Sequence, residues 1–177
     1  LNFEISKDDI LNKKPFLFFK NEDEKVYQYL DETRKNILLV VGASWKSKMY
    51  SKEKFVKIVQ NLKENFLIAW GNEEEKEIAE FICDNSDAIV LPKIDLNTLK
   101  ALISRVDLVI GNDTGPTHMA WALNIPSITI FGNTPAYRNA YETKINKSVE
   151  SSSFVNPFKL DKKDFSIKMI DENIIID

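Results

Sequence analysis

The segment from Gly111 to His118 carries the residue types best suited to binding chemistry in this chain. It follows an apolar run at 106–110 that predicts a strand, and it opens a helical pattern at 114–123. Thr114 suits the N-cap, and Pro116 is tolerated in the first turn because the amide it lacks would be unbonded there. Unpaired amides and the positive end of the helix dipole then favour a diphosphate. We expect these amides to belong to Gly115, Thr117 and His118.

His118 and Gly115 in this segment strengthen the prediction. His118 is the only histidine of the chain, and in the first helical turn it can donate to a phosphate. Gly115 allows a ligand to approach the backbone closely. Asp113 begins an Asp-Thr-Gly triplet like that of aspartic proteases, but those enzymes use two aspartates at one site. The triplet occurs once, in an α/β pattern, so we exclude that class.

A loop with a hydroxyl group and two lysines follows the strand predicted at 37–41. Within the loop Gly42–Tyr50, Ser44, Lys46 and Lys48 could clamp a phosphate. The loop has neither the Walker spacing nor the G-x-G-x-x-G dinucleotide spacing. A solvated loop is the alternative interpretation.

Two further candidates follow other predicted strands. Glu73 lies after the strand at 66–70, where an acid can accept hydrogen bonds from ribose hydroxyls. The helix dipole alone also favours acids at a helix start, so this position has a purely structural alternative. Arg138, in the loop after the strand at 127–131, is a possible anion contact.

The elements that must position these residues alternate regularly. Short apolar runs and amphipathic stretches predict strands at 37–41, 66–70, 88–91, 106–110 and 127–131, and helices at 51–62, 72–84, 96–104 and 114–123. This alternation predicts an α/β fold with a Rossmann-like, doubly wound parallel sheet. Ligands bind such sheets beyond the carboxyl ends of the strands, where the candidate residues lie.

Three weaker patterns lie outside this alternation. Phe16–Phe19 is an apolar run that could form a strand, and Asn21–Arg34 has a charged, amphipathic pattern that predicts a helix. A short helix is predicted over Asp164–Ile170. We expect residues 1–35 to form an inter-domain segment and residues 36–177 to form one domain.

Composition narrows the class of protein. The 177 residues are 44% hydrophobic, enough for one domain core, and the formal net charge of −3 argues against nucleic-acid binding. The single cysteine, Cys83, excludes an intrachain disulfide, and no signal peptide is visible, so we expect a cytoplasmic protein. No clustered acids call for a metal, and no cofactor is expected. The first residue is Leu1, which suggests a fragment of a longer protein.

Taken together, the loops resemble the lipopolysaccharide heptosyltransferase family. The resemblance covers roughly residues 36–140. It is strongest in three segments: Gly111–Ala120, Leu123–Pro126 and Phe131–Thr134. The family pattern is an aspartate, Thr or Ser, glycine, two residues and a histidine, followed by an apolar helix and an F-G-x-T loop. The stretch Thr134–Tyr141 looks most similar to the enzymes that add the first heptose to Kdo.

The resemblance implies the C-terminal, donor-binding half of a two-domain GT-B glycosyltransferase. It implies ADP-heptose as donor and a lipid A-Kdo acceptor for the full-length enzyme. We expect the protein to be a monomer, peripheral at the inner face of the inner membrane. By the resemblance, Asp113, Thr114, Gly115 and His118 hold the diphosphate and sugar, Ser44 with Lys48 or Lys46 holds phosphate, and Glu73 holds ribose.

The sequence departs from the family pattern in two ways. Trp45 stands where many relatives have a small hydroxyl residue, and Trp121 is bulkier than the usual residue. The family's general base lies in the N-terminal domain, and this chain offers no candidate, so we expect the fragment to bind donor without turnover. Two alternatives stay open: a transferase that uses a UDP- or GDP-sugar, and a non-catalytic nucleotide-binding module.

Overall fold

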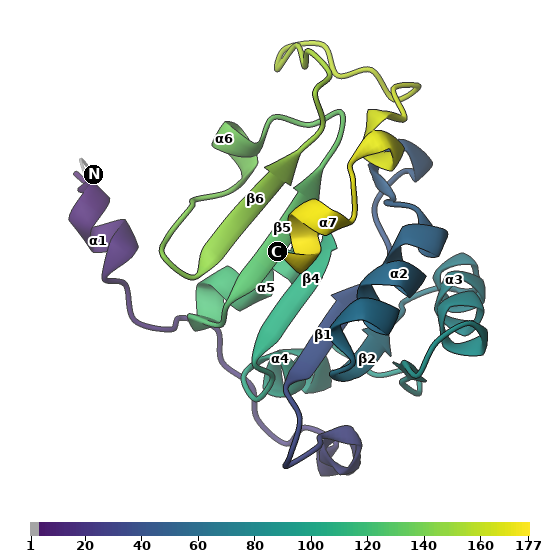
Figure 1. Cartoon of the computed structure of the whole chain (residues 1–177). Coiled ribbons are helices and arrows are strands. Elements are labelled where there is room, and N and C mark those ends of the chain that lie inside the picture. Colours follow the sequence, from purple (N-terminus) through teal and green to yellow (C-terminus); the bar gives the residue numbers. More distant parts are fainter. Residues whose placement is uncertain (1–3) are drawn as a thin grey trace.

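The computed structural model of the chain describes residues 4–177 and shows one parallel sheet with helices on both faces (Figure 1). The strands are β1 (Asn36–Val40), β2 (Asn65–Ala69), β3 (Ile89–Val90), β4 (Leu108–Asn112), β5 (Ser127–Phe131) and β6 (Asn146–Glu150). Their order is β3-β2-β1-β4-β5-β6, and every pairing is parallel. The chain therefore winds outward from β1 in one direction and from β4 in the other, which confirms the predicted doubly wound α/β fold.

The helices divide between the two faces of the sheet. One layer contains α2 (Lys52–Leu62), α3 (Glu73–Asp84), the 3-10 turn η3 (Ser166–Met169) and α7 (Asn173–Ile176). The other contains the 3-10 turn η1 (Glu24–Tyr29), α4 (Leu96–Ile103) and α5 (Gly115–Leu123). Three short elements lie outside these layers: α1 (Lys7–Leu11), the 3-10 turn η2 (Lys46–Lys48) and α6 (Ala136–Asn139).

Strand β1 shows why the central strands have continuous apolar sequences. Ile37 and Leu39 pack into the core beneath α2 and α3, whereas Leu38 and Val40 pack into the core beneath α4 and α5. Successive side chains of a strand point to opposite faces, so a strand covered on both sides needs apolar residues throughout. All five residues of β1 are buried.

Helix ends follow the local sequence signals. Asn72 caps α3, because its side chain accepts a hydrogen bond of 3.0 Å from the Glu75 amide. Asn124 ends α5 in the left-handed conformation, with φ of 60°, as its position before Ile125-Pro126 predicts. Asn72 thus fixes where the loop after β2 ends, and Asn124 fixes where the loop before β5 begins.

The sixth strand, β6, is absent from the sequence prediction. Its sequence, Asn-Lys-Ser-Val-Glu, lacks the apolar run of the inner strands. It pairs only with β5 and lies at the edge of the sheet, so one side of its backbone needs no partner strand and several side chains stay in solvent. The prediction of five strands is therefore correct for the five but incomplete.

Two predictions for the first third of the chain are wrong. Phe16–Phe19 is extended but pairs with no strand among residues 4–177. The helix predicted over Asn21–Arg34 is reduced to η1, because Leu30 is extended and the Asp31 carboxylate accepts from the Thr33 and Arg34 amides, forming a turn.

Near the C-terminal end, the helix expected over Asp164–Ile170 is the shorter 3-10 turn η3.

Candidate functional site

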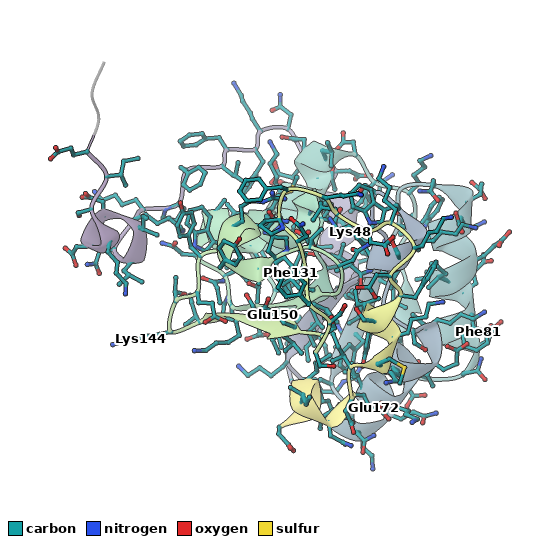
Figure 2. All side chains as sticks on the ribbon, turned by 90° about the horizontal axis from the view of Figure 1, so that it is seen from above. Lys48, Phe81, Phe131, Lys144, Glu150 and Glu172 are labelled. Atoms are coloured by element: carbon teal, nitrogen blue, oxygen red, sulfur yellow. The ribbon has the colours of Figure 1, made fainter. Side chains whose placement is uncertain are left out.

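The candidate site lies where the winding direction of the sheet reverses, between β1 and β4. Residues that follow these two strands meet beyond the carboxyl ends of the strands, where doubly wound sheets bind ligands. The Lys48 ammonium, from the loop after β1, lies 2.7 Å from the carboxylate of Asp113, which directly follows β4. Figure 2, seen from above, labels Lys48 over the middle of the molecule.

Asp113 is the centre of a polar cluster. Besides Lys48, its carboxylate has three partners: His118 Nε2 at 2.9 Å, the Thr134 hydroxyl at 2.8 Å and the Asn139 amide at 3.0 Å. The Asp113 side chain is only 5% exposed. A buried carboxylate with this many donors is held in one orientation.

The environment of Asp113 keeps it ionised. Burial alone would raise the pKa of this carboxyl, but the hydrogen bonds from His118, Lys48 and Thr134, with the charge of Lys48, outweigh it. The net effect lowers the Asp113 pKa well below its usual value. The Lys48–Asp113 pair is therefore a buried ion pair, with the two charges partly neutralising each other.

The loop after β1 is fixed by Asn112, the last residue of β4. Its side-chain amide donates to the Val41 carbonyl at 2.7 Å, and its side-chain oxygen accepts from the Tyr50 amide at 2.9 Å. Asn112 is fully buried. One side chain thus holds both ends of the loop, and this places Lys48 beside Asp113.

The other two predicted residues of this loop are arranged differently. Ser44 is exposed, and Lys46 extends outward to form an ion pair of 2.9 Å with Glu74. Of the two lysines that the sequence left as alternatives, the structure places Lys48 at the Asp113 cluster and Lys46 at the rim.

The start of α5 has the predicted form with one correction. Thr114 occupies the N-cap, and the side chain of Thr117 donates to the Asn112 carbonyl at 2.8 Å. The His118 amide is not free, because it donates to the Thr114 carbonyl at 3.2 Å. The helix pattern leaves the amides of Gly115 and Thr117 without a helical acceptor.

Gly115 presents bare backbone to solvent. A Cβ built on Gly115 would meet nothing within 4 Å among the described residues, so a ligand could come close there. Gly111 contrasts with it: a Cβ there would lie 2.6 Å from the Thr117 hydroxyl and 2.7 Å from Val40 Cβ. Gly111 is needed for packing, whereas Gly115 is not.

Besides Glu74, which pairs with Lys46, a second acidic residue of α3 approaches the loop after β1, namely Glu75. Its carboxylate accepts from the Gly71 amide at 2.7 Å and covers Gly42, where a Cβ would lie 2.1 Å from Glu75 Oε1. Glu73, the predicted residue, is exposed at the first position of α3. Arg138 does not contact Asp113 directly: its guanidinium donates to the Pro157 carbonyl at 2.7 Å and to the side-chain oxygen of Asn139 at 3.3 Å.

Several polar residues of the site were not among the predicted ones. They are Ser47, Asn112, Asn133, Thr134 and Asn139. Thr134 belongs to the F-G-x-T pattern and could have been found from it. The others are small polar residues whose importance comes from which loops they join, and their sequence spacing carries no signal for that.

Comparison with known proteins identifies the family. The profile of glycosyltransferase family 9 (heptosyltransferase) matches residues 8–163. Lipopolysaccharide heptosyltransferase 1 of Campylobacter coli is 42% identical over 171 residues, covering 87% of this chain and 50% of that protein. Lipopolysaccharide core heptosyltransferase OpsX of Haemophilus influenzae is 30% identical over 123 residues, covering 66% of this chain and 34% of that protein. The chain thus spans half or less of the length of these relatives.

Solved structures agree on the fold. The Escherichia coli heptosyltransferase WaaC with ADP-2-deoxy-2-fluoro heptose superposes with a TM-score of 0.67 at 19% identity, over 82% of this chain and 43% of that one. The E. coli ADP-heptose LPS heptosyltransferase II superposes with a TM-score of 0.69 at 16% identity, over 89% of this chain and 51% of that one. The family match and the fold together confirm the predicted resemblance: this chain belongs to glycosyltransferase family 9, the heptosyltransferase family.

Proposed function

We propose that the chain binds ADP-heptose as the C-terminal donor-binding half of an inverting, two-domain GT-B heptosyltransferase of lipopolysaccharide core synthesis. The observation that supports this most strongly is the Lys48–Asp113 pair at the reversal of the sheet, next to the open start of α5. A related structure contains ADP-2-deoxy-2-fluoro heptose, which is a donor analogue in that protein.

The diphosphate would bind between the start of α5 and the loop after β1. The Gly115 and Thr117 amides point out of the helix start, where the dipole favours an anion. Lys48 is held at Asp113, two residues before Gly115, and can turn part of its charge from Asp113 to a phosphate oxygen. Ser44, exposed in the same loop, would donate a further hydrogen bond.

Asp113 and His118 would contact the sugar side of the donor. An ionised carboxylate accepts hydrogen bonds from sugar hydroxyls, and the low pKa of Asp113 keeps it in that form at neutral pH. His118 is about one-third exposed, so its ring can reach a ligand while it keeps its contact with Asp113.

The ribose would lie near the end of β2, against an acidic residue at the start of α3. The family resemblance assigns this role to Glu73, whereas the contact with Gly42 favours Glu75. Either carboxylate can accept from ribose hydroxyls. The two residues therefore need separate substitution.

The full-length enzyme would transfer heptose by direct displacement. The acceptor hydroxyl attacks the anomeric carbon as the bond to ADP breaks, and the amides at the start of α5 with Lys48 stabilise charge on the leaving diphosphate. The base that takes the hydroxyl proton is assigned to the other half, so this chain alone is expected to bind donor without transfer.

The acceptor of the full-length enzyme would be a lipid A-Kdo oligosaccharide, with the enzyme at the cytoplasmic face of the inner membrane and residues 1–35 joining the two halves. No helix among the described residues is long and apolar enough to cross a membrane.

Calorimetric titration of ADP, UDP and GDP into the chain tests the donor assignment. We expect ADP to bind more tightly than UDP or GDP, and we expect Gln in place of whichever glutamate holds ribose to weaken ADP binding. Glu73→Gln and Glu75→Gln serve as controls for each other. A preference for UDP or GDP would contradict ADP-heptose as donor, and equal binding of all three would support a general nucleotide-binding module instead.

A further inference from the structure

The proposed diphosphate site has less positive charge than its lysines suggest. The charge of Lys48 is opposed by Asp113 at 2.7 Å, and that of Lys46 by Glu74 at 2.9 Å. A diphosphate carries at least two negative charges at neutral pH, so a paired lysine and two amides leave part of its charge unmatched. A further cation close to the site, one without an acidic partner, would match the remaining charge.

Lys162 is such a cation. It belongs to the segment 151–165 after β6, which passes above the carboxyl ends of the strands before it turns back to η3 (Figure 1). Its ammonium lies 4.5 Å from the centre of the Trp45 ring, and the Lys48 ammonium lies 5.4 Å from the same ring. Within the described part of the chain, no carboxylate lies within 4.0 Å of the Lys162 ammonium.

A buried side chain fixes this arrangement at its base. Asn133, only 2% exposed, donates to the Asp161 carbonyl at 2.7 Å and to the Ser47 hydroxyl at 2.9 Å. It thereby joins the residue before Lys162 to the residue before Lys48. Lys48 and Lys162 are 114 positions apart in the sequence, and this bridge and the Trp45 ring bring them to the same part of the fold.

We propose that Lys162 is a second cation for the diphosphate of the donor, and that the Trp45 ring holds it beside Lys48 while the site is empty. This role rests on the proposed function. An exposed cation–π contact is weak, whereas a hydrogen bond from an ammonium to a phosphate oxygen is charge-assisted. Lys162 can therefore leave the ring for the phosphate at small cost.

Calorimetry with ADP and adenosine, at low salt, tests the role. Lys162→Ala should weaken ADP binding about tenfold and leave adenosine binding unchanged, because only ADP carries the phosphates. Lys162→Arg should retain most of the ADP affinity. Lys163→Ala is the matched control: it removes the same charge one position away, from a side chain that contacts no aromatic ring among the described residues.

Each other outcome has a definite meaning. Equal ADP affinities for Lys162→Ala and Lys163→Ala would overturn the role of Lys162 and leave the proposed function intact. Equal losses of ADP and adenosine binding would show that Lys162 only stabilises the loop, and would also overturn it. If the unaltered chain binds adenosine but gains nothing from the phosphates of ADP, the proposed diphosphate site itself is wrong.

Discussion

Asp113 is the residue on which the candidate site depends most, because four side chains converge on its carboxylate. The sequence identified Asp113, His118 and Lys48 as candidates, but it could not show that they touch. Lys48 and Asp113 come from different loops, and their contact depends on β1 and β4 being neighbours in the sheet. Strand order is a property of the whole fold, so no local pattern predicts it.

Replacing Asp113 by Asn tests whether the ion pair stabilises the fold. The variant leaves Lys48 buried without its counter-charge, so we expect a loss of about 3 kcal/mol in the free energy of unfolding at pH 7. Urea denaturation measures it. Glu80→Gln, which breaks the exposed Lys76–Glu80 pair, is the control and should cost less than about 0.5 kcal/mol.

The pH dependence of this loss has a definite sign. The pKa of Asp113 is lower in the folded chain than its ordinary value of 3.8, so the ionised carboxylate stabilises the fold above that pH. The contribution is lost as the pH falls from about 4 towards the folded pKa. The difference in the free energy of unfolding between the natural chain and Asp113→Asn should therefore become smaller below pH 4. A difference that stays constant from pH 7 to pH 3 would contradict the ionised pair.

At the scale of elements, helix α5 links the packing of the core to the proposed ligand site. Its start is predictable from Thr114, Pro116 and the apolar pattern, because capping and proline preferences act locally. The edge strand β6 is not predictable in this way, since an edge position tolerates polar residues. The turn that replaces the helix over Asn21–Arg34 depends on Asp31, whose side chain competes with the helix for backbone amides.

Replacement by alanine should have different effects on stability at the two glycines that flank the loop between β4 and α5. Gly111→Ala places a Cβ against Thr117 and Val40, so we expect it to destabilise the fold by about 1–3 kcal/mol. Gly115→Ala meets open space and should leave the melting temperature unchanged or slightly higher. It should instead weaken ADP binding, because its methyl group occupies the place proposed for phosphate.

Thermal melting and ADP calorimetry on the same two variants separate these effects. If Gly115→Ala bound ADP as tightly as the natural chain, the diphosphate could not lie against the start of α5. If Gly111→Ala melted at the natural temperature, the close packing of β4 against α5 would not hold in solution.

At the scale of the whole molecule, the net charge does not describe the distribution of charge at the proposed donor site. The chain carries a formal charge of −3, yet Lys48, the two helix-start amides and the positive end of α5 gather beyond the carboxyl ends of β1 and β4. The doubly wound sheet produces this by placing the loops after β1 and β4 at one edge. The fold could be predicted from the alternation of strands and helices, whereas this convergence required the strand order.

The most direct test of the account is an NMR titration of ADP into the isotope-labelled chain. We predict that the backbone amides of Gly115 and Thr117 shift most, together with those of the loop from Gly42 to Tyr50, because the diphosphate is proposed to bind between them. Largest shifts away from this edge, such as around the groove lined by Lys63 and Asp84, would contradict the assignment of the donor site.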